Sequence, residues 1–189
     1  MARRSPVVVS CLVAGVMLLL AYAAVGRDRD AHAPRLVLTS GGTLELSNSL
    51  DGAAVLSADD MRPGALASGT ISVSNTGSLD GALSLAQADL VDAPGPLGGR
   101  LSDHLQLAVE ELGAGATVQS LYAGTLSGLG SRALGTLGAG QTRSYRFTVS
   151  FPDGGAPPLP GTGDDRFQSA SLEVDYVWTA TEIEGGGGG

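Results

Sequence analysis

Strict alternation of apolar and polar residues is the clearest pattern in the chain, and it is strongest in residues 142–151 and 171–179. A period of two is that of a β-strand with one buried face. The apolar faces consist of Tyr145, Phe147, Val149 and Phe151 in the first segment and of Leu172, Val174, Tyr176 and Trp178 in the second. Six of the eight aromatic residues lie between Tyr145 and Trp178, so we expect these two strands to supply the centre of the core.

A second alternating region surrounds residues 69–74, where Ile71 and Val73 are separated by hydroxyl residues. The preceding Arg62-Pro63-Gly64 predicts a turn. Asn75-Thr76-Gly77 predicts another, because Asn and Gly tolerate positive φ values. The alternation resumes after it, so we expect a β-hairpin whose return strand carries Leu83 and Leu85.

Weaker patterns complete the fold prediction. Residues 104–111 alternate, with Leu105, Leu107 and Val109 expected to face inward, although a helix is the rival interpretation. Residues 35–38 and 43–46 predict short strands around Gly41-Gly42, and residues 93–99 predict a loop. Residues 113–140 are rich in Gly, Ala, Leu and Ser; we expect a helical turn near 126–129 and loops elsewhere. The fold class is therefore all-β, a single antiparallel β-sandwich of either jelly-roll or Ig-like type.

The N-terminus has the build of an export signal. Arg3 and Arg4 precede an apolar run from Val7 to Leu20, which ends in small residues. This pattern predicts a signal peptide over residues 1–26, cleaved near 23–26. A retained membrane anchor is the alternative, because the apolar run extended to Gly26 is about 20 residues long.

The rest of the chain divides into three parts. Residues 27–35 are charged and predict a linker, and residues 36–181 contain the strands of the β-sandwich domain. Residues 182–189 are an acidic and then polyglycine tail, which we expect to be disordered.

Charge and cysteine content restrict the function. The only cysteine, Cys11, lies in the predicted signal, so the exported protein would have no disulfide. The chain has 11 arginines, no lysine and a net charge of −8. Cleavage would leave 9 arginines against 19 acidic residues, a net charge of −10. Such a protein repels phosphate groups, so we expect neither nucleic acid nor a membrane surface as a partner.

The candidates for catalysis or metal binding are few. Two histidines are present, His32 and His104, and they are not spaced as in the His-Glu-x-x-His motif of zinc peptidases. Ser127 and Ser131 lie outside any Gly-x-Ser-x-Gly motif. We therefore assign no catalytic, cofactor-binding or metal-ligating residue and expect no cofactor and no small-molecule substrate.

Two further loop motifs have a structural interpretation. The acidic pairs Asp59-Asp60 and Asp164-Asp165 are expected to be solvated loop charges, with calcium binding as the alternative. Residues 159–163, Leu-Pro-Gly-Thr-Gly, match a sortase signal. They lack the apolar stretch and basic tail that should follow such a signal, so we expect a loop between strands.

Turn and strand motifs follow one another in a fixed order along the chain: Asp51-Gly52, Pro63-Gly64, residues 69–77, Leu101-Ser102-Asp103, residues 137–141 before the strand at 145–149, Leu159-Pro160, Phe167-Gln168 and a final strand ending at Trp178. Over roughly residues 36–180, this order resembles the camelysin/TasA family of exported bacterial proteins. The resemblance implies a β-sandwich. Some members of the family build extracellular biofilm fibres, and others are classed as metallopeptidases.

The resemblance and the residues together lead to an expected function. We expect a secreted or cell-surface structural protein, not an enzyme, which assembles into surface or biofilm matrix fibres when residues 27–46 exchange between copies. Its partners would be further copies or other matrix proteins, and signal peptidase during export. The alternatives are a metal-dependent endopeptidase of the camelysin type and a monomeric cell-surface binding module.

Overall fold

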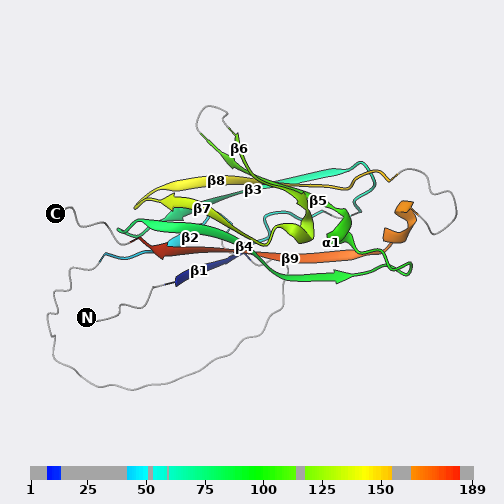
Figure 1. Ribbon diagram of the computed structural model, residues 1–189, viewed down its shortest axis with the longest axis horizontal. Helices are drawn as coiled ribbons and strands as arrows, with labels where there is room; N and C mark the ends of the chain where they lie inside the picture. The colour runs from blue at the N-terminus through cyan, green and yellow to red at the C-terminus, as the bar shows by residue number, and fades with distance from the viewer. Residues whose placement is uncertain are drawn as a thin grey trace, which may run out of the picture.

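The computed structural model describes residues 8–13, 42–50, 53–58, 60–113, 118–154 and 163–183. Within these ranges the protein is all-β, with antiparallel strands in a four-stranded sheet, β1-β9-β4-β7, and a five-stranded sheet, β2-β3-β8-β5-β6 (Figure 1). The strands are β1 (Val8–Val13), β2 (Leu46–Asn48), β3 (Leu66–Asn75), β4 (Gly81–Ala93), β5 (Gln106–Leu112), β6 (Val118–Thr125), β7 (Ser131–Leu137), β8 (Thr142–Ser150) and β9 (Ser171–Glu182). The helical pieces are α1 (Leu101–His104) and the 3-10 turns η2 (Leu126–Gly128) and η3 (Gly163–Phe167).

The two sheets pack together through an aromatic contact between β8 and β9. Trp178 is fully buried, and its ring centroid lies 4.7 Å from that of Tyr145 and 6.5 Å from that of Phe147. Because β8 is central in one sheet and β9 is central in the other, these rings fill the middle of the core. The prediction that these two strands supply the core is confirmed.

The predicted inward faces are correct for β5 and β8 and partly correct for β9. Leu105, Leu107 and Val109 are buried, as are all four apolar residues predicted for residues 142–151. On β9, Tyr176 and Trp178 are buried, but Leu172 and Val174 are only half-buried. A groove lies beside these two residues.

The predicted β3–β4 hairpin is wrong. β3 pairs with β2 and β8, whereas β4 pairs with β7 and β9, so the connection at 76–80 crosses from one sheet to the other. Alternation shows that each strand has a buried face, but it does not distinguish pairing in one sheet from facing across two sheets.

Asn75 holds this crossover together from inside. It is 1% exposed, and its Nδ2 donates to the carbonyl oxygens of Leu79 (2.7 Å) and Leu137 (3.2 Å). Its Oδ1 accepts from the Gly77 amide at 3.0 Å. Among the described residues, neither Asn75 nor Gly77 has a positive φ. The prediction that positive φ values explain this turn is therefore wrong. Asn75 acts through its amide, and Gly77 is needed because a Cβ there would lie 2.1 Å from the Thr43 carbonyl oxygen.

Two other predicted turns are confirmed. The Arg62-Pro63-Gly64 turn is present: the Ala65 amide donates to the Arg62 carbonyl at 2.8 Å, and Gly64 has a φ of +83°. The helical turn near 126–129 is confirmed as η2. The loops expected over the rest of 113–140 are wrong for β6 and β7, which occupy most of that segment.

Most of the segments predicted near the two ends of the chain lie outside the described residues. These are the linker at 27–35, the strand at 35–38, residues 184–189 of the tail and all of residues 1–26 except β1. The strand expected at 43–46 is shifted and begins at Leu46. β1 pairs antiparallel with β9, from Val8 opposite Thr181 to Val13 opposite Tyr176 (Figure 1). Within the described ranges, no helix is long and apolar enough to span a bilayer.

Replacement of Trp178 by Ala should destabilise the protein by about 3–5 kcal/mol, through lost transfer energy and the cavity left between the sheets. The measurement is urea unfolding followed by far-UV circular dichroism. Leu66→Ala is the matched control, because Leu66 is 72% exposed and should change stability by less than about 0.5 kcal/mol. A Trp178→Ala loss below about 1 kcal/mol would contradict the central position of this residue.

Asn75→Ala should cost about 2–4 kcal/mol, because it leaves two carbonyl groups and one amide without their partner. The same unfolding assay measures it. Thr76→Ala is the control, since Thr76 is exposed and its hydroxyl lies 3.5 Å from the Glu45 carbonyl. Equal effects of the two substitutions would show that Asn75 does not hold the crossover.

Candidate functional site: the edge of β9 and its groove

The β9 strand is paired unevenly along its two sides. β4 accompanies it from Ser171 to Glu182, with one irregularity in register. On the other side, β1 covers only Tyr176–Thr181. The segment Leu172–Val174 therefore has a strand neighbour on one side only, as far as the described residues show. An unpaired edge is a template for another strand.

An apolar groove lies between the two sheets next to this part of β9. It has a volume of about 570 Å³. Leu172, Val174 and Tyr176 form one wall, and the opposite wall comes from β5, β8 and the residue after it, with Leu107, Val149 and Phe151. Residues 54–58, 60 and 61 line a third side. These last residues lie close to β3, because a Cβ on Gly69 would clash with the Val55 carbonyl.

The polar residues of the groove are neutral or acidic. They are Ser57, Asp60, Gln168, Ser169, Ser171 and Glu173. Among the described residues that line it, none is an arginine. The arrangement can bury apolar side chains of an incoming segment and offers backbone groups of β9 for pairing.

On the side of the molecule away from the groove, Arg143 links the two sheets. From β8 it reaches β7 in the other sheet, donating to the carbonyl oxygens of Leu134 (2.9 Å) and Thr136 (2.5 Å). Its guanidinium lies 3.6 Å from Glu111. Arg132 of β7 also lies over the Tyr122 ring of β6, at 5.1 Å. Side-chain contacts therefore tie the two sheets along this side.

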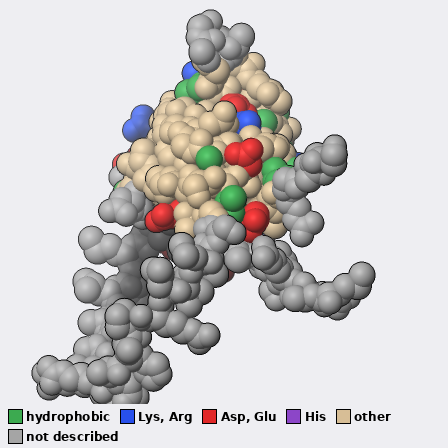
Figure 2. Space-filling model, turned by 90° about the vertical axis from the view of Figure 1, so that its left-hand side faces the viewer, with side chains coloured by type: hydrophobic (Ala, Val, Ile, Leu, Met, Phe, Trp, Pro, Cys, Tyr) green, Lys and Arg blue, Asp and Glu red, His purple; other side chains and the backbone are tan. Residues whose placement is uncertain are grey.

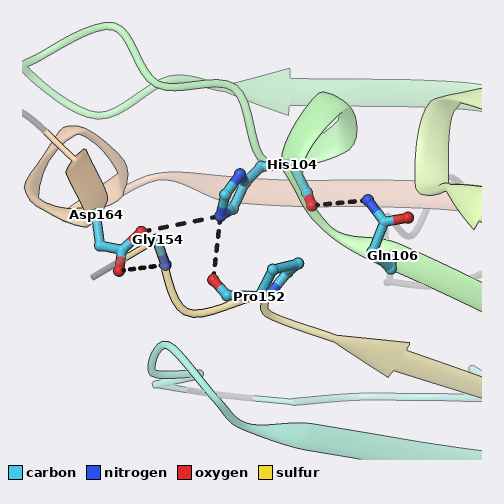
Figure 3. Close-up of polar contacts among 5 residues, drawn as sticks. All are labelled: His104, Gln106, Pro152, Gly154 and Asp164. Atoms are coloured by element: carbon cyan, nitrogen blue, oxygen red, sulfur yellow. Dashed lines mark hydrogen bonds and ion pairs between the residues drawn. The ribbon is translucent and has the colours of Figure 1, made fainter.

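His104 lies at the junction of α1 and β5 (Figure 3). Its Nε2 is 3.3 Å from the Pro152 carbonyl oxygen and 3.9 Å from Asp164 Oδ1. Asp164 Oδ2 accepts from the Gly154 amide at 3.1 Å, and the imidazole stacks on Phe167 with centroids 4.3 Å apart. These contacts connect η3 to the segment after β8 and hold Phe167 at the end of the groove.

Asp164 is the one described sequence candidate beside His104, and the expectation that it is a solvated loop charge is wrong, because its side chain is 14% exposed and accepts from the Gly154 amide. His32 and Asp59 lie outside the described residues. Ser127 bonds to Asp103 at 3.2 Å, and Ser131 begins β7. In the described part of the chain, no group of three or more His, Cys, Asp or Glu side chains is placed to hold a metal ion.

Sequence reasoning missed the groove and the half-paired β9. The alternation of Leu172 and Val174 indicates a buried face, but it does not show whether a neighbouring strand covers the edge beside them. No protein-family model and no curated protein matches this sequence.

Two tyrosines near the core should make stability fall at alkaline pH. Burial, and secondarily the Glu111 carboxylate, raise the pKa of Tyr145 to about 12. Burial also raises the pKa of Tyr176. Unfolded tyrosines lose their proton near pH 10. The stabilisation is therefore fully present below about pH 10 and is lost as the pH rises towards about 12.

Urea unfolding at a series of pH values between 8 and about 12 measures this loss. Tyr145→Phe is the control, and its stability should decline less steeply over the same range. A wild-type stability that stays constant across this range would contradict the burial of both hydroxyl groups.

Proposed function

We propose that this protein is an exported structural protein of the camelysin/TasA type, which assembles at the cell surface or in an extracellular matrix when a strand from another copy joins β9. The observation that carries the proposal is the position of β1. Residues 8–13 pair with β9, yet they lie inside the signal peptide expected over residues 1–26. Cleavage of that peptide would remove β1 and expose the β9 edge from Leu172 to Thr181.

The incoming strand on this proposal belongs to residues 27–46 of a second copy. A strand added to a sheet edge gains affinity from main-chain hydrogen bonds and specificity from pockets for alternate side chains. The β9 edge supplies the main-chain hydrogen-bonding groups, and the adjoining groove supplies the pocket for side chains. The apolar sequence Leu36-Val37-Leu38 has the composition that such a groove accepts.

We also propose the jelly-roll form of the sandwich over the Ig-like form. The orders β1-β9-β4-β7 and β3-β8-β5-β6 are those of two interleaved four-stranded sheets, with β2 added to one edge. In this arrangement β1 and β9 are paired neighbours although they lie at opposite ends of the chain. A strand from another molecule can therefore replace β1 without any change in the connections of the remaining strands.

Charge opposes association between copies. The cleaved chain would carry a net charge of −10, and acidic side chains are scattered over the visible face of the domain in Figure 2. Added salt screens charge repulsion, with a Debye length of about 10 Å at 0.1 M. Assembly should accordingly be favoured by salt or by mild acid.

Two other functions remain as alternatives. A camelysin-type endopeptidase would need a metal centre; one equivalent of bound zinc with chelator-sensitive proteolysis would favour it. A binding module for a polysaccharide or another protein would remain monomeric under assembly conditions. Neither alternative makes use of the half-paired β9 edge.

Deletion of residues 27–38 from the signal-cleaved protein should abolish fibres, because the apolar strand is then missing while the domain from residue 42 onwards is intact. Sedimentation and electron microscopy in salt and in mild acid measure the outcome. Deletion of residues 184–189 is the matched control, since it shortens the chain without removing an apolar segment, and it should leave fibres unchanged. Fibres from the 27–38 deletion, or a full-length mature protein that stays monomeric, would refute strand exchange.

A further inference from the structure

The strand β6 forms one edge of the five-stranded sheet, whose order is β2-β3-β8-β5-β6 (Figure 1). It pairs with β5 along one side, and among the described residues no strand pairs with its other side. Its sequence, Val-Gln-Ser-Leu-Tyr-Ala-Gly-Thr, contains neither a charged residue nor proline. The register with β5 shifts once, so that Leu121 has no partner there. An edge without charge or proline is open to a further strand.

One hydrogen bond shows which main-chain groups of β6 point away from β5. The Leu126 amide donates to the Leu105 carbonyl oxygen at 2.8 Å. Alternate residues of an antiparallel strand bond to the same neighbour, so Tyr122 faces β5, whereas Ala123 and Thr125 face away. The Thr125 carbonyl oxygen accepts from the Tyr122 hydroxyl at 2.5 Å. The open N–H and C=O groups at this end of β6 are therefore those of Ala123, which is exposed.

Two other edges of the sandwich are protected in ways that β6 is not. β2, at the opposite end of the same sheet, is three residues long. β7, an edge of the four-stranded sheet, carries Arg132, and its Leu134 and Thr136 carbonyl oxygens accept from Arg143. Short length and charged side chains are means by which proteins prevent pairing between edges. β6 has eight residues and no charge, so its edge favours pairing.

The charges beside β6 are compensated, although the whole chain has a net charge of −8. The β5 residue Glu110 accepts from Arg146 at 2.7 Å, and Glu111 lies 3.6 Å from Arg143. Two copies that meet at this edge would therefore not bring unpaired carboxylates of β5 together. Val118 of β6 is 46% exposed, and contact with a second copy would remove apolar surface from water. An antiparallel edge can also pair with its own copy about a twofold axis.

We propose that two copies of this protein pair β6 with β6, antiparallel, and thereby join their five-stranded sheets into one continuous sheet. This contact goes beyond the proposed function. Strand exchange uses β9 in the four-stranded sheet, whereas this contact uses the far edge of the other sheet. Each copy can therefore take part in both contacts.

Ala123→Pro in the full-length chain tests this contact. The substitution removes the outward N–H group, and proline is tolerated on an edge strand where the N–H faces solvent, so the monomer should still fold. Ala123→Val is the matched control, because it also adds bulk and keeps the N–H group. Sedimentation equilibrium should show a dimer whose Kd rises by about tenfold or more with proline and by less than about threefold with valine.

Hydrogen exchange supplies a second measurement, because the Ala123 amide should exchange more slowly as the protein concentration rises. Trp178 fluorescence establishes that each variant is folded. If the proline variant is not, Ala123→Lys replaces it, with Ala82→Lys, exposed on the central strand β4, as its control.

The dimer should survive deletion of residues 27–38, which separates it from strand exchange at β9. A wild-type chain that stays monomeric, equal dimerisation of the test and control variants, or loss of the dimer on that deletion would overturn the inference. Fibre growth of the cleaved protein tests the proposed function independently of these results.

Discussion

The pairing of β9 with β4 and β1 holds the aromatic core of the domain in place. This strand carries Trp178 and Tyr176 into the core, so it has to be held firmly in the sheet. A central strand must satisfy the backbone groups on both of its sides. β4 pairs with one side of β9 along its length, whereas β1 pairs with the other side over Tyr176–Thr181. The function we propose follows from this difference between two sides of one strand.

The remaining connections make the domain rigid around that edge. Asn75 fixes the crossover between the sheets through three side-chain hydrogen bonds, and Arg143 links β8 to β7 on the far side. His104 ties η3 to the segment after β8 and thereby fixes one end of the groove. A rigid frame beside a half-paired strand suits recognition of an extended segment, because main-chain groups of the strand are open to pairing.

The sequence predicts those strands in which buried and exposed residues alternate strongly. It does not predict strands with weak alternation, and it does not show which strands pair with each other. β8 could be identified because every second residue from Tyr145 to Phe151 is buried. β6 and β7 could not, because small residues and glycines give them little contrast between their faces. The separation of β3 from β4 depends on the buried amide of Asn75, whereas the sequence suggests a turn built on positive φ at this position.

The groove beside β9 could not be predicted either, because it too depends on how the strands pair. Leu172 and Val174 have the same pattern as a fully covered strand, and only the pairing of β9 shows that a groove lies beside them. His104 was recognisable as a candidate, but its contacts with Phe167 and Asp164 join segments far apart in the chain. Such juxtapositions arise from topology, which local patterns do not specify.

Hydrogen exchange of the β9 amides tests the central claim most directly. It should be measured on the full-length chain, the cleaved monomer and the assembled material. We expect edge amides within Tyr176–Thr181 to exchange slowly in the full-length chain, quickly in the cleaved monomer and slowly again after assembly. Equal protection of these amides in all three states would contradict the claim that β9 accepts a strand.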